Sequence, residues 1–228
     1  MYRKTPFMEN EHYHIYSRGV EKRKIFLNDR NYDRFVALLY IMNQDVAFRM
    51  DNFLQTHKNN LLEIFNEKRK EKLVSILGYC LMPNHFHLIL YEFKEGGISK
   101  FMGKLLTAYS MYFNTKYERS GPLFTRPFRS KHISNESQYM YLFSYLHLNP
   151  ISRIEKSWKE DGVKNKQEAE RFLQTYKYSS YPDFRKGNRQ ESKILDLSRV
   201  PKYIKTIKLD FGTQEKIFRE NNIIEVKF

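Results

Sequence analysis

Cysteine is almost missing from this sequence: its 228 residues include one, Cys80. An internal disulfide is therefore excluded, and a reducing, cytoplasmic environment is expected. A metal site built from thiolates is excluded as well, because such sites need several cysteines. Any metal ion bound by this chain would have nitrogen and oxygen ligands.

Long apolar runs and internal repeats are also missing. No stretch reaches 18 consecutive apolar residues, so we expect no transmembrane helix and no membrane partner. The first residues, 1–6, lack the apolar core of a signal peptide. The length indicates one main domain, and a hydrophobic content of 41% supplies enough material for a real core.

Acidic side chains are outnumbered. Lys and Arg total 40 against 26 Asp and Glu, which gives a formal charge of +14. A protein this basic usually binds a polyanion, with nucleic acid as the default partner. A basic soluble surface and an anionic membrane surface are the alternatives. With 17 Tyr and 18 Phe, some aromatic rings should be exposed.

Apolar spacing and helix caps predict the order of the elements. The expected elements are a strand over 12–17, a helix over 30–43 capped by Asp29, a polar insertion over 45–72 with one amphipathic helix around 61–65, a strand pair over 73–81 and 85–91, a helix over 99–117, a loop or short hairpin over 119–133, a helix over 136–149 capped by Asn135, and a charged helical stretch over 153–174. This mixture predicts an α+β fold in which helices cover an antiparallel sheet.

Two histidines one residue apart mark the segment 83–90, Pro-Asn-His-Phe-His-Leu-Ile-Leu. Successive strand residues point to opposite faces, so His85 and His87 share one face and Phe86 lies on the other. We expect the Phe86 face to be buried and the histidine face to be open. Two imidazoles on one face can hold a divalent cation. The alternative is a histidine pair that only makes hydrogen bonds.

The helix over 136–149 carries a second set of polar side chains. Tyr141, Tyr145 and Asn149 are four residues apart and form one stripe, while His147 faces roughly the opposite side. If the stripe faces the histidine strand, Asn149 can offer a carbonyl oxygen to the same cation, with Tyr145 beside it. The alternative is simple packing, because a helical tyrosine more often belongs to the core.

Basic and aromatic side chains are interleaved at two places, which is a pattern that suits a nucleic-acid strand. The candidate DNA-binding residues are Arg126, Phe128, Arg129 and Lys131 before the tyrosine helix, and Arg18 and Arg23 after the first strand. Either cluster could instead be a solvated surface.

Several blocks together resemble a known family. The blocks are Tyr13-His14-Ile15-Tyr16-Ser17-Arg18-Gly19, Leu81-Met82-Pro83-Asn84-His85-Phe86-His87-Leu88, Gly121-Pro122-Leu123-Phe124 followed by Arg126-Pro127-Phe128-Arg129, Tyr145-Leu146-His147-Leu148-Asn149-Pro150, and Tyr178-Ser179-Ser180-Tyr181. In this order and spacing they resemble the single-tyrosine HUH transposases, and among these the REP-associated tyrosine transposases. The resemblance covers about residues 12–182.

The resemblance implies a ferredoxin-like, RRM-like domain over residues 1–182, with the insertion at 45–72 and a basic C-terminal extension over 183–228. It also implies a metal-dependent endonuclease and strand transferase that acts on single-stranded or hairpin DNA through a covalent phosphotyrosine. In this reading Tyr145 is the nucleophile, with Tyr141 as the fallback, and His85, His87 and Asn149 hold Mg²⁺ or Mn²⁺. Members of this family act as monomers or homodimers.

Two other functions stay open at this point. One is a non-catalytic nucleic-acid-binding module on an RRM-like sheet. The other is a metal hydrolase in which His85 and His87 serve to activate water. The stripe of Tyr145 and Asn149 favours the transposase over the hydrolase.

Overall fold

The computed structural model describes residues 6–185, 188–207 and 209–221. Within them, four antiparallel strands form one sheet in the order β2-β3-β1-β4. The strands are β1 (Glu11–Arg18), β2 (Ser75–Met82), β3 (His85–Glu92) and β4 (Arg129–Ile133). Together with helices α1 (Asp29–Ile41) and α3 (Gly97–Lys116), they follow one another as β-α-β-β-α-β. The predicted α+β, ferredoxin-like class is confirmed.

The strand pair predicted around the two histidines is present. β2 and β3 pair from Ser75 opposite Tyr91 to Met82 opposite His85, with a bulge between Ile76 and Gly78. The segment left open as a loop or short hairpin contributes β4, which pairs with β1 and not with a neighbouring segment. A short 3-10 helix, η1 (Val20–Lys22), follows β1.

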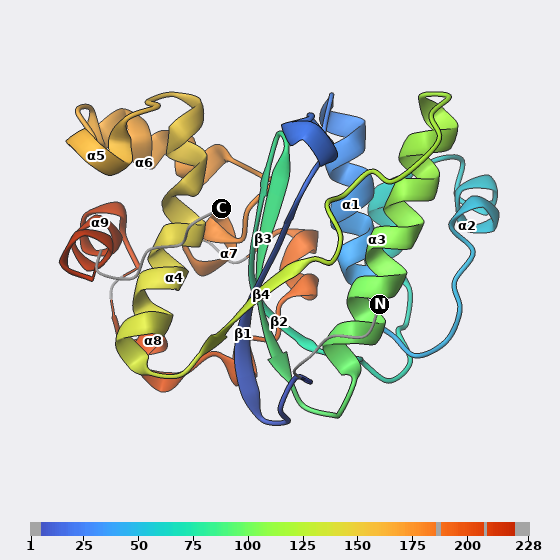
Figure 1. Ribbon diagram of the computed structural model, residues 1–228, viewed down its shortest axis with the longest axis horizontal. Coiled ribbons are helices and arrows are strands. Elements are labelled where there is room, and N and C mark those ends of the chain that lie inside the picture. Colours follow the sequence, from blue (N-terminus) through green and yellow to red (C-terminus); the bar gives the residue numbers. More distant parts are fainter. Residues whose placement is uncertain (1–5, 186–187, 208, 222–228) are drawn as a thin grey trace.

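Helices α1 and α3 cover one face of the sheet (Figure 1). Helix α1 begins where expected, but its cap is Asn28, not Asp29. The Asn28 side chain accepts a hydrogen bond from the backbone N–H of Asn31 at 3.3 Å. Asp29 instead occupies the first turn, where a negative charge favours the helix dipole.

The segment 45–72 differs from the single amphipathic helix expected there. It contains α2 (Met50–Thr56) and a separate 3-10 helix, η2 (Leu61–Asn66). Ile64 and Phe65 are buried against α1, whereas Leu62 is exposed. The segment from the Asn60 cap to the end of η2 contains only six residues. A segment this short does not form a stable α-helix without tertiary support.

Helix α4 (Glu136–Leu148) lies across the other face of the sheet. Its predicted cap is correct: the Asn135 side chain accepts from the Gln138 backbone N–H at 2.9 Å. The chain then continues through η3 (Asn149–Arg153), α5 (Trp158–Asp161), α6 (Lys166–Thr175), α7 (Tyr181–Arg185), η4 (Gln190–Ile194), η5 (Leu197–Arg199), α8 (Lys202–Thr206) and α9 (Phe211–Glu220). The charged stretch over 153–174, expected to be helical, contains α5 and α6 as separate helices, because the chain turns at Gly162 with φ 88°.

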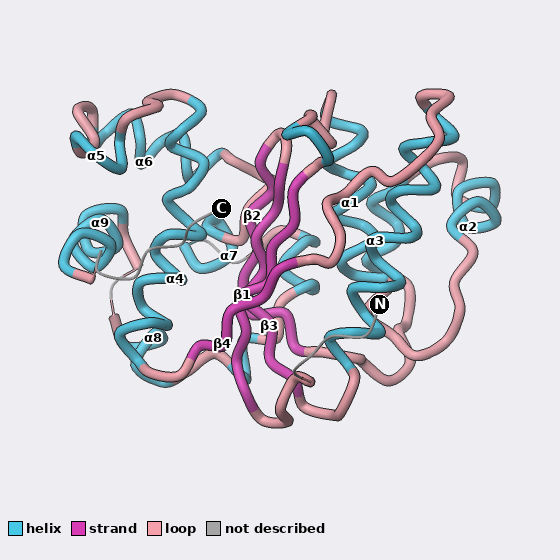
Figure 2. The backbone as a smooth tube through the Cα atoms, in the orientation of Figure 1, coloured by secondary structure: helices cyan, strands magenta, loops and turns pink. Residues whose placement is uncertain are grey.

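The sheet is therefore enclosed between two helical layers (Figure 2). One core lies between the sheet and α1 with α3, and a second lies between the sheet and α4 with α9. The expectation that the histidine face of β3 is open is wrong: Phe86 and His87 are both fully buried. The reason is that α4 and the segments after it cover the face that a bare ferredoxin-like fold leaves exposed.

The predicted C-terminal extension, 183–228, forms part of this cover. Phe211 and Phe218 of α9 belong to the second core, and α9 packs against α4. Residues 186–187, 208 and 222–228 of the extension lie outside the described residues. None of the described helices is long and apolar enough to cross a membrane.

Candidate active site

Strand β3 presents His85 and His87 on the face that α4 covers. Their ring centroids are 5.0 Å apart, and the two rings are perpendicular. His87 is fully buried, whereas His85, at the end of the strand, is partly exposed. The side-chain alternation that the sequence predicts thus holds, and one of the two imidazoles reaches the surface.

Hydrogen bonds fix the orientation of both rings through the same atom, Nδ1. His85 Nδ1 lies 2.7 Å from Asn84 Oδ1, and Asn84 Nδ2 donates to the Lys22 carbonyl at 3.2 Å. Because the amide nitrogen is used there, Asn84 presents its oxygen to His85, so His85 Nδ1–H donates. The metal-accepting lone pair of His85 is then on Nε2.

His87 has a histidine as its neighbour. His87 Nδ1 lies 2.9 Å from His14 Nε2, and the two rings are stacked at 5.1 Å. When His87 donates and His14 accepts, the lone pair of His87 is on Nε2, as in His85. A ligating histidine commonly uses its other nitrogen in this way, which orients the ring for the metal ion.

Burial keeps these imidazoles neutral at physiological pH. It lowers the pKa of His14 and of His85 to about 3, and it lowers the pKa of His87 well below 6.5. A protonated imidazole cannot bind a metal ion, whereas a neutral one can. The histidines of this site are therefore in the protonation state that can bind a metal ion.

Helix α4 places Tyr145 directly against the histidine strand. The Tyr145 ring lies 5.4 Å from the His87 ring and perpendicular to it. Tyr141, one turn earlier, stacks on Tyr145 at 6.2 Å, and Phe218 of α9 stacks on Tyr141 at 5.4 Å. The predicted tyrosine stripe thus faces the histidine strand, with Tyr145 as the nearer ring.

The Tyr145 hydroxyl is not activated by its surroundings alone. Burial raises the pKa of Tyr145 well above its ordinary value near 10, and the nearby Arg18 guanidinium opposes that rise. A phenol in this state is a weak nucleophile without help from a cation.

Asn149 is the third residue of the predicted metal site. It is buried at the start of η3, and its side-chain nitrogen has no hydrogen-bond partner among the described residues. No group of three or more His, Cys, Asp and Glu side chains in the described ranges is placed to hold a metal ion. Two neutral imidazoles and the oxygen of the Asn149 amide would fit a divalent ion as a mixed nitrogen and oxygen donor set, whereas the amide nitrogen is a hydrogen-bond donor and cannot bind a cation.

Lys159 is a polar neighbour of Tyr145 that the sequence patterns do not reveal. Its ammonium nitrogen lies 3.4 Å from the Tyr145 hydroxyl oxygen and 4.7 Å from the centroid of the Tyr145 ring. Burial lowers the pKa of Lys159, and the carboxylate of Glu160 opposes that shift.

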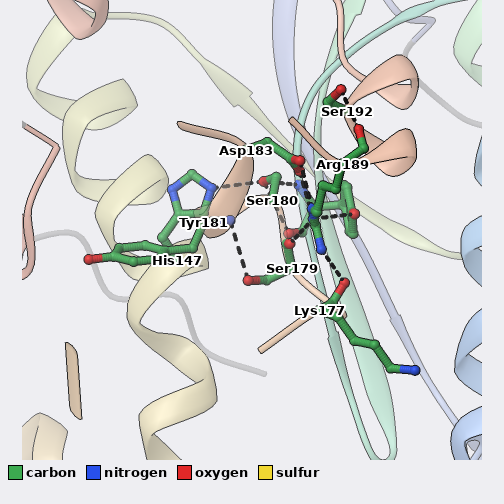
Figure 3. Close-up of polar contacts among 9 residues, drawn as sticks. His147, Lys177, Ser179, Ser180, Tyr181, Asp183, Arg189 and Ser192 are labelled. Atoms are coloured by element: carbon green, nitrogen blue, oxygen red, sulfur yellow. Dashed lines mark hydrogen bonds and ion pairs between the residues drawn. The ribbon is translucent and has the colours of Figure 1, made fainter. Parts of the chain in front are cut away.

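His147 lies apart from this cluster, as its helix position predicts. Its Nε2 atom lies 2.8 Å from the Ser180 hydroxyl oxygen, which also accepts from the Tyr79 backbone N–H at 2.9 Å (Figure 3). Both side chains are fully buried. The contact ties α4 to the segment around Ser179, which pairs with β2 at Cys80, so we assign His147 a structural role.

His85 opens onto two basic cavities. The first, of about 290 Å³, is lined by His85 together with Arg18, Lys22 and Arg129. The second, of about 660 Å³, has His85 and Lys22 in common with it and is also lined by Lys24, Arg153 and Lys156. The exposed end of the histidine strand is therefore bordered by several cationic side chains, with the acidic Glu21 also lining the first cavity.

The predicted DNA-binding residues do not form one surface. Arg18 and Arg129 line the first of these cavities, and Lys131 pairs with His14 on the same face of the sheet. Arg126 and Phe128 instead line a cavity of about 370 Å³ against α3. Arg23 is held locally, by an ion pair with Glu21 at 2.8 Å and a hydrogen bond to the Val20 carbonyl.

His14 and Lys159 are the two site residues that sequence reasoning missed. His14 had a signal, because His12-Tyr13-His14 repeats the histidine alternation of β3 on the strand that pairs with it. Lys159 had none, since its position depends on how a four-residue helix packs.

One comparison with known protein families matches part of this chain. Residues 46–149 match the family model described as IS200-like transposase, a range that includes the histidine strand and α4 through Asn149. No curated protein matches the chain. A solved structure of a REP-associated tyrosine transposase bound to a REP hairpin is similar with a TM-score of 0.48 and 12% identity, over 86% of this chain and 92% of that one. The family model thus agrees with the resemblance over residues 46–149 of this chain.

Proposed function

We propose that this protein cleaves and rejoins single-stranded or hairpin DNA through a covalent bond to Tyr145, with a divalent metal ion, Mg²⁺ or Mn²⁺, as cofactor. The observation that carries the proposal is the contact between the Tyr145 ring and the His87 ring at 5.4 Å. It brings a candidate nucleophile from one sequence block against a candidate metal ligand from another.

The charge around the site supports a nucleic-acid substrate. Arg18 and Arg129 line the cavity at His85 and can neutralise the backbone phosphates on either side of the bond to be cut. The chain as a whole carries a formal charge of +14. A single strand bound here would be held mainly by its phosphates, so its affinity would fall steeply with salt.

The side chains have separate roles in the reaction. Asn84 and His14 orient the rings of His85 and His87, and these two with Asn149 would hold the metal ion. When bound, the ion polarises the scissile phosphate and stabilises the charge that develops on it. The Tyr145 oxygen forms a bond to phosphorus while the bond from phosphorus to a sugar oxygen breaks. The reverse attack by a sugar hydroxyl rejoins the strand and frees Tyr145.

Covalent trapping tests this proposal. Hairpin-forming single-stranded oligonucleotides of randomised sequence are incubated with the protein and Mn²⁺, and the protein–DNA adduct is detected under denaturing conditions. Wild type and Tyr141→Phe should form the adduct, whereas Tyr145→Phe and a sample with EDTA should not. Tyr141→Phe is the matched control because its ring stacks on Tyr145 in the same stripe.

The other outcomes identify the alternatives. An adduct that persists in Tyr145→Phe would show that the nucleophile is assigned wrongly. Metal-dependent cutting without an adduct would indicate a hydrolase that uses water. Binding that survives EDTA, with no cutting at all, would indicate a non-catalytic nucleic-acid-binding module.

A further inference from the structure

Lys159 places a cationic nitrogen within hydrogen-bonding range of the candidate nucleophilic oxygen. Its Nζ atom lies 3.4 Å from the Tyr145 hydroxyl, with the ammonium as donor and the phenol oxygen as acceptor. This distance is long for a hydrogen bond, as is common in resting sites whose bonds tighten only when the substrate is bound. The Tyr145 side chain is nearly fully buried, so negative charge on its oxygen would be costly there without a nearby cation.

The fold holds Lys159 at this place through its neighbours. Trp158, the preceding residue, is fully buried and packs against Phe218 of α9 at 4.9 Å. The Trp158 carbonyl accepts from the Arg219 guanidinium at 3.3 Å. After α5 the chain turns at Gly162, where a Cβ atom would lie 2.7 Å from Arg219. A lysine on a short surface helix is thereby turned towards the interior.

We propose that Lys159 stabilises the Tyr145 oxygen electrostatically when it attacks the phosphate and when it leaves again. This inference rests on the proposed function and adds a residue from outside the family's sequence blocks to it. Lys159 stays an ammonium throughout. The phenol gives up one proton to solvent as its oxygen bonds to phosphorus, and the departing sugar oxygen takes up one proton, so charge and atoms balance.

Reversibility gives the proposal a distinctive consequence. The same ammonium that stabilises the phenol oxygen during attack also stabilises it as the leaving group during rejoining. Loss of Lys159 should therefore slow both directions by a similar factor. A lysine that only binds DNA would change the affinity for the oligonucleotide and leave the rate at saturation unchanged.

Single-turnover kinetics at saturating oligonucleotide and Mn²⁺ provide the test. Lys159→Met should slow adduct formation by about 10²–10³-fold, the loss that follows removal of one donor to a developing oxyanion. Rejoining from the isolated adduct should slow by a similar factor, and the Kd for DNA should change less than about threefold. The matched control is Lys164→Met, an exposed lysine shortly after the same short helix, which should behave as wild type.

A chemical rescue separates the charge of Lys159 from its packing. The chain has one cysteine, Cys80, which is fully buried. In Lys159→Cys, the new thiol is therefore the one that an alkylating reagent can reach. Alkylation with bromoethylamine rebuilds an ammonium at that position and should restore at least a tenth of the wild-type rate. Alkylation with iodoacetamide adds a neutral group and should not, and treated wild type should be unchanged.

Each result shows which of the two proposals fails, the proposed function or the role of Lys159. Absence of any Tyr145 adduct in wild type would overturn the proposed function and this inference together. A wild-type adduct with an unchanged rate in Lys159→Met, a loss confined to the Kd, a loss in one direction only, or failure of the bromoethylamine rescue would overturn the role of Lys159 alone.

Discussion

At the scale of single residues, the site depends on hydrogen bonds made by atoms that do not react. His85 and His87 both use Nδ1 in a bond to a neighbour, Asn84 in one case and His14 in the other. The neighbours orient the rings, and when both rings donate through Nδ1 their lone pairs are on Nε2, the atoms that would bind the proposed metal ion. The two histidines are thus part of a site that extends beyond their own strand, to β1 and to α4.

We predict that His14→Phe weakens Mn²⁺ binding by about 10–100-fold, the usual cost of losing a partner behind a metal-ligating histidine. The new ring keeps the stack on His87 but has no nitrogen to accept its proton. Isothermal titration calorimetry with Mn²⁺ measures the change. His12→Phe, on the same face of the same strand but without a hydrogen bond to His87, is the control. Equal affinities in the two variants would contradict the role of His14.

The sequence predicts the parts of this site that depend on local spacing. Alternation puts His85 and His87 on one face, and four-residue spacing puts Tyr141 and Tyr145 in one stripe. The link between His87 and His14 is not visible in the same way, because it depends on which strands pair and in which register. Lys159 is beyond local reasoning, since the neighbouring Trp158 packs against Phe218 of α9, far along the chain.

At the scale of elements, capping side chains and a glycine determine where helices begin and end. Asn28 and Asn135 cap α1 and α4 through side chains that accept a backbone N–H. The charged stretch over 153–174 has the composition of one helix, but Gly162 interrupts it with φ 88° and ψ 170°. This conformation is essentially restricted to glycine, so the break is built into the sequence.

We expect Gly162→Ala to lower the free energy of unfolding by about 1–3 kcal/mol, because alanine is strained in that region of backbone conformation and its Cβ would clash with Arg219. Gly103→Ala is the control, because Gly103 lies inside α3 and a Cβ added there would meet no atom within 4 Å. It should raise stability by about 0.5–1 kcal/mol. Urea titrations compare them, and two variants of equal stability would refute the assignment of the break to Gly162.

At the scale of the whole molecule, the chain closes both faces of a sheet that the ferredoxin-like order leaves open on one side. The segments after α4 are held in place by a polar clasp around Arg189 (Figure 3). Its guanidinium bonds to Asp183 at 2.6 Å, to the Tyr79 hydroxyl at 2.9 Å, and to the carbonyls of Lys177 and Ser179. The Asp183 carboxylate is buried and its ion pair with Arg189 lies within the extension, while the hydrogen bond from Arg189 to the Tyr79 hydroxyl links the extension to β2.

Removing Arg189 should be costly, because a buried carboxylate is left without its counter-ion. We predict that Arg189→Met lowers the free energy of unfolding by about 3–5 kcal/mol, the usual cost of breaking a buried pair. Arg185→Met removes a neighbouring, more exposed pair with Glu170 at 3.5 Å and should cost less than about 1 kcal/mol. Thermal and urea unfolding of both variants measure the difference. A cost below about 1 kcal/mol for Arg189→Met would show that the clasp does not hold the extension.

The central claim is that Tyr145 becomes bonded to DNA at a site completed by His85 and His87. The most direct measurement is mass-spectrometric mapping of the covalent adduct after digestion with protease and nuclease. We expect a residual nucleotide phosphate on the Tyr145 hydroxyl in samples with Mn²⁺, and none in samples with His87→Ala or EDTA. A nucleotide found on Tyr141 or on any other residue, or on Tyr145 independently of the metal ion, would contradict it.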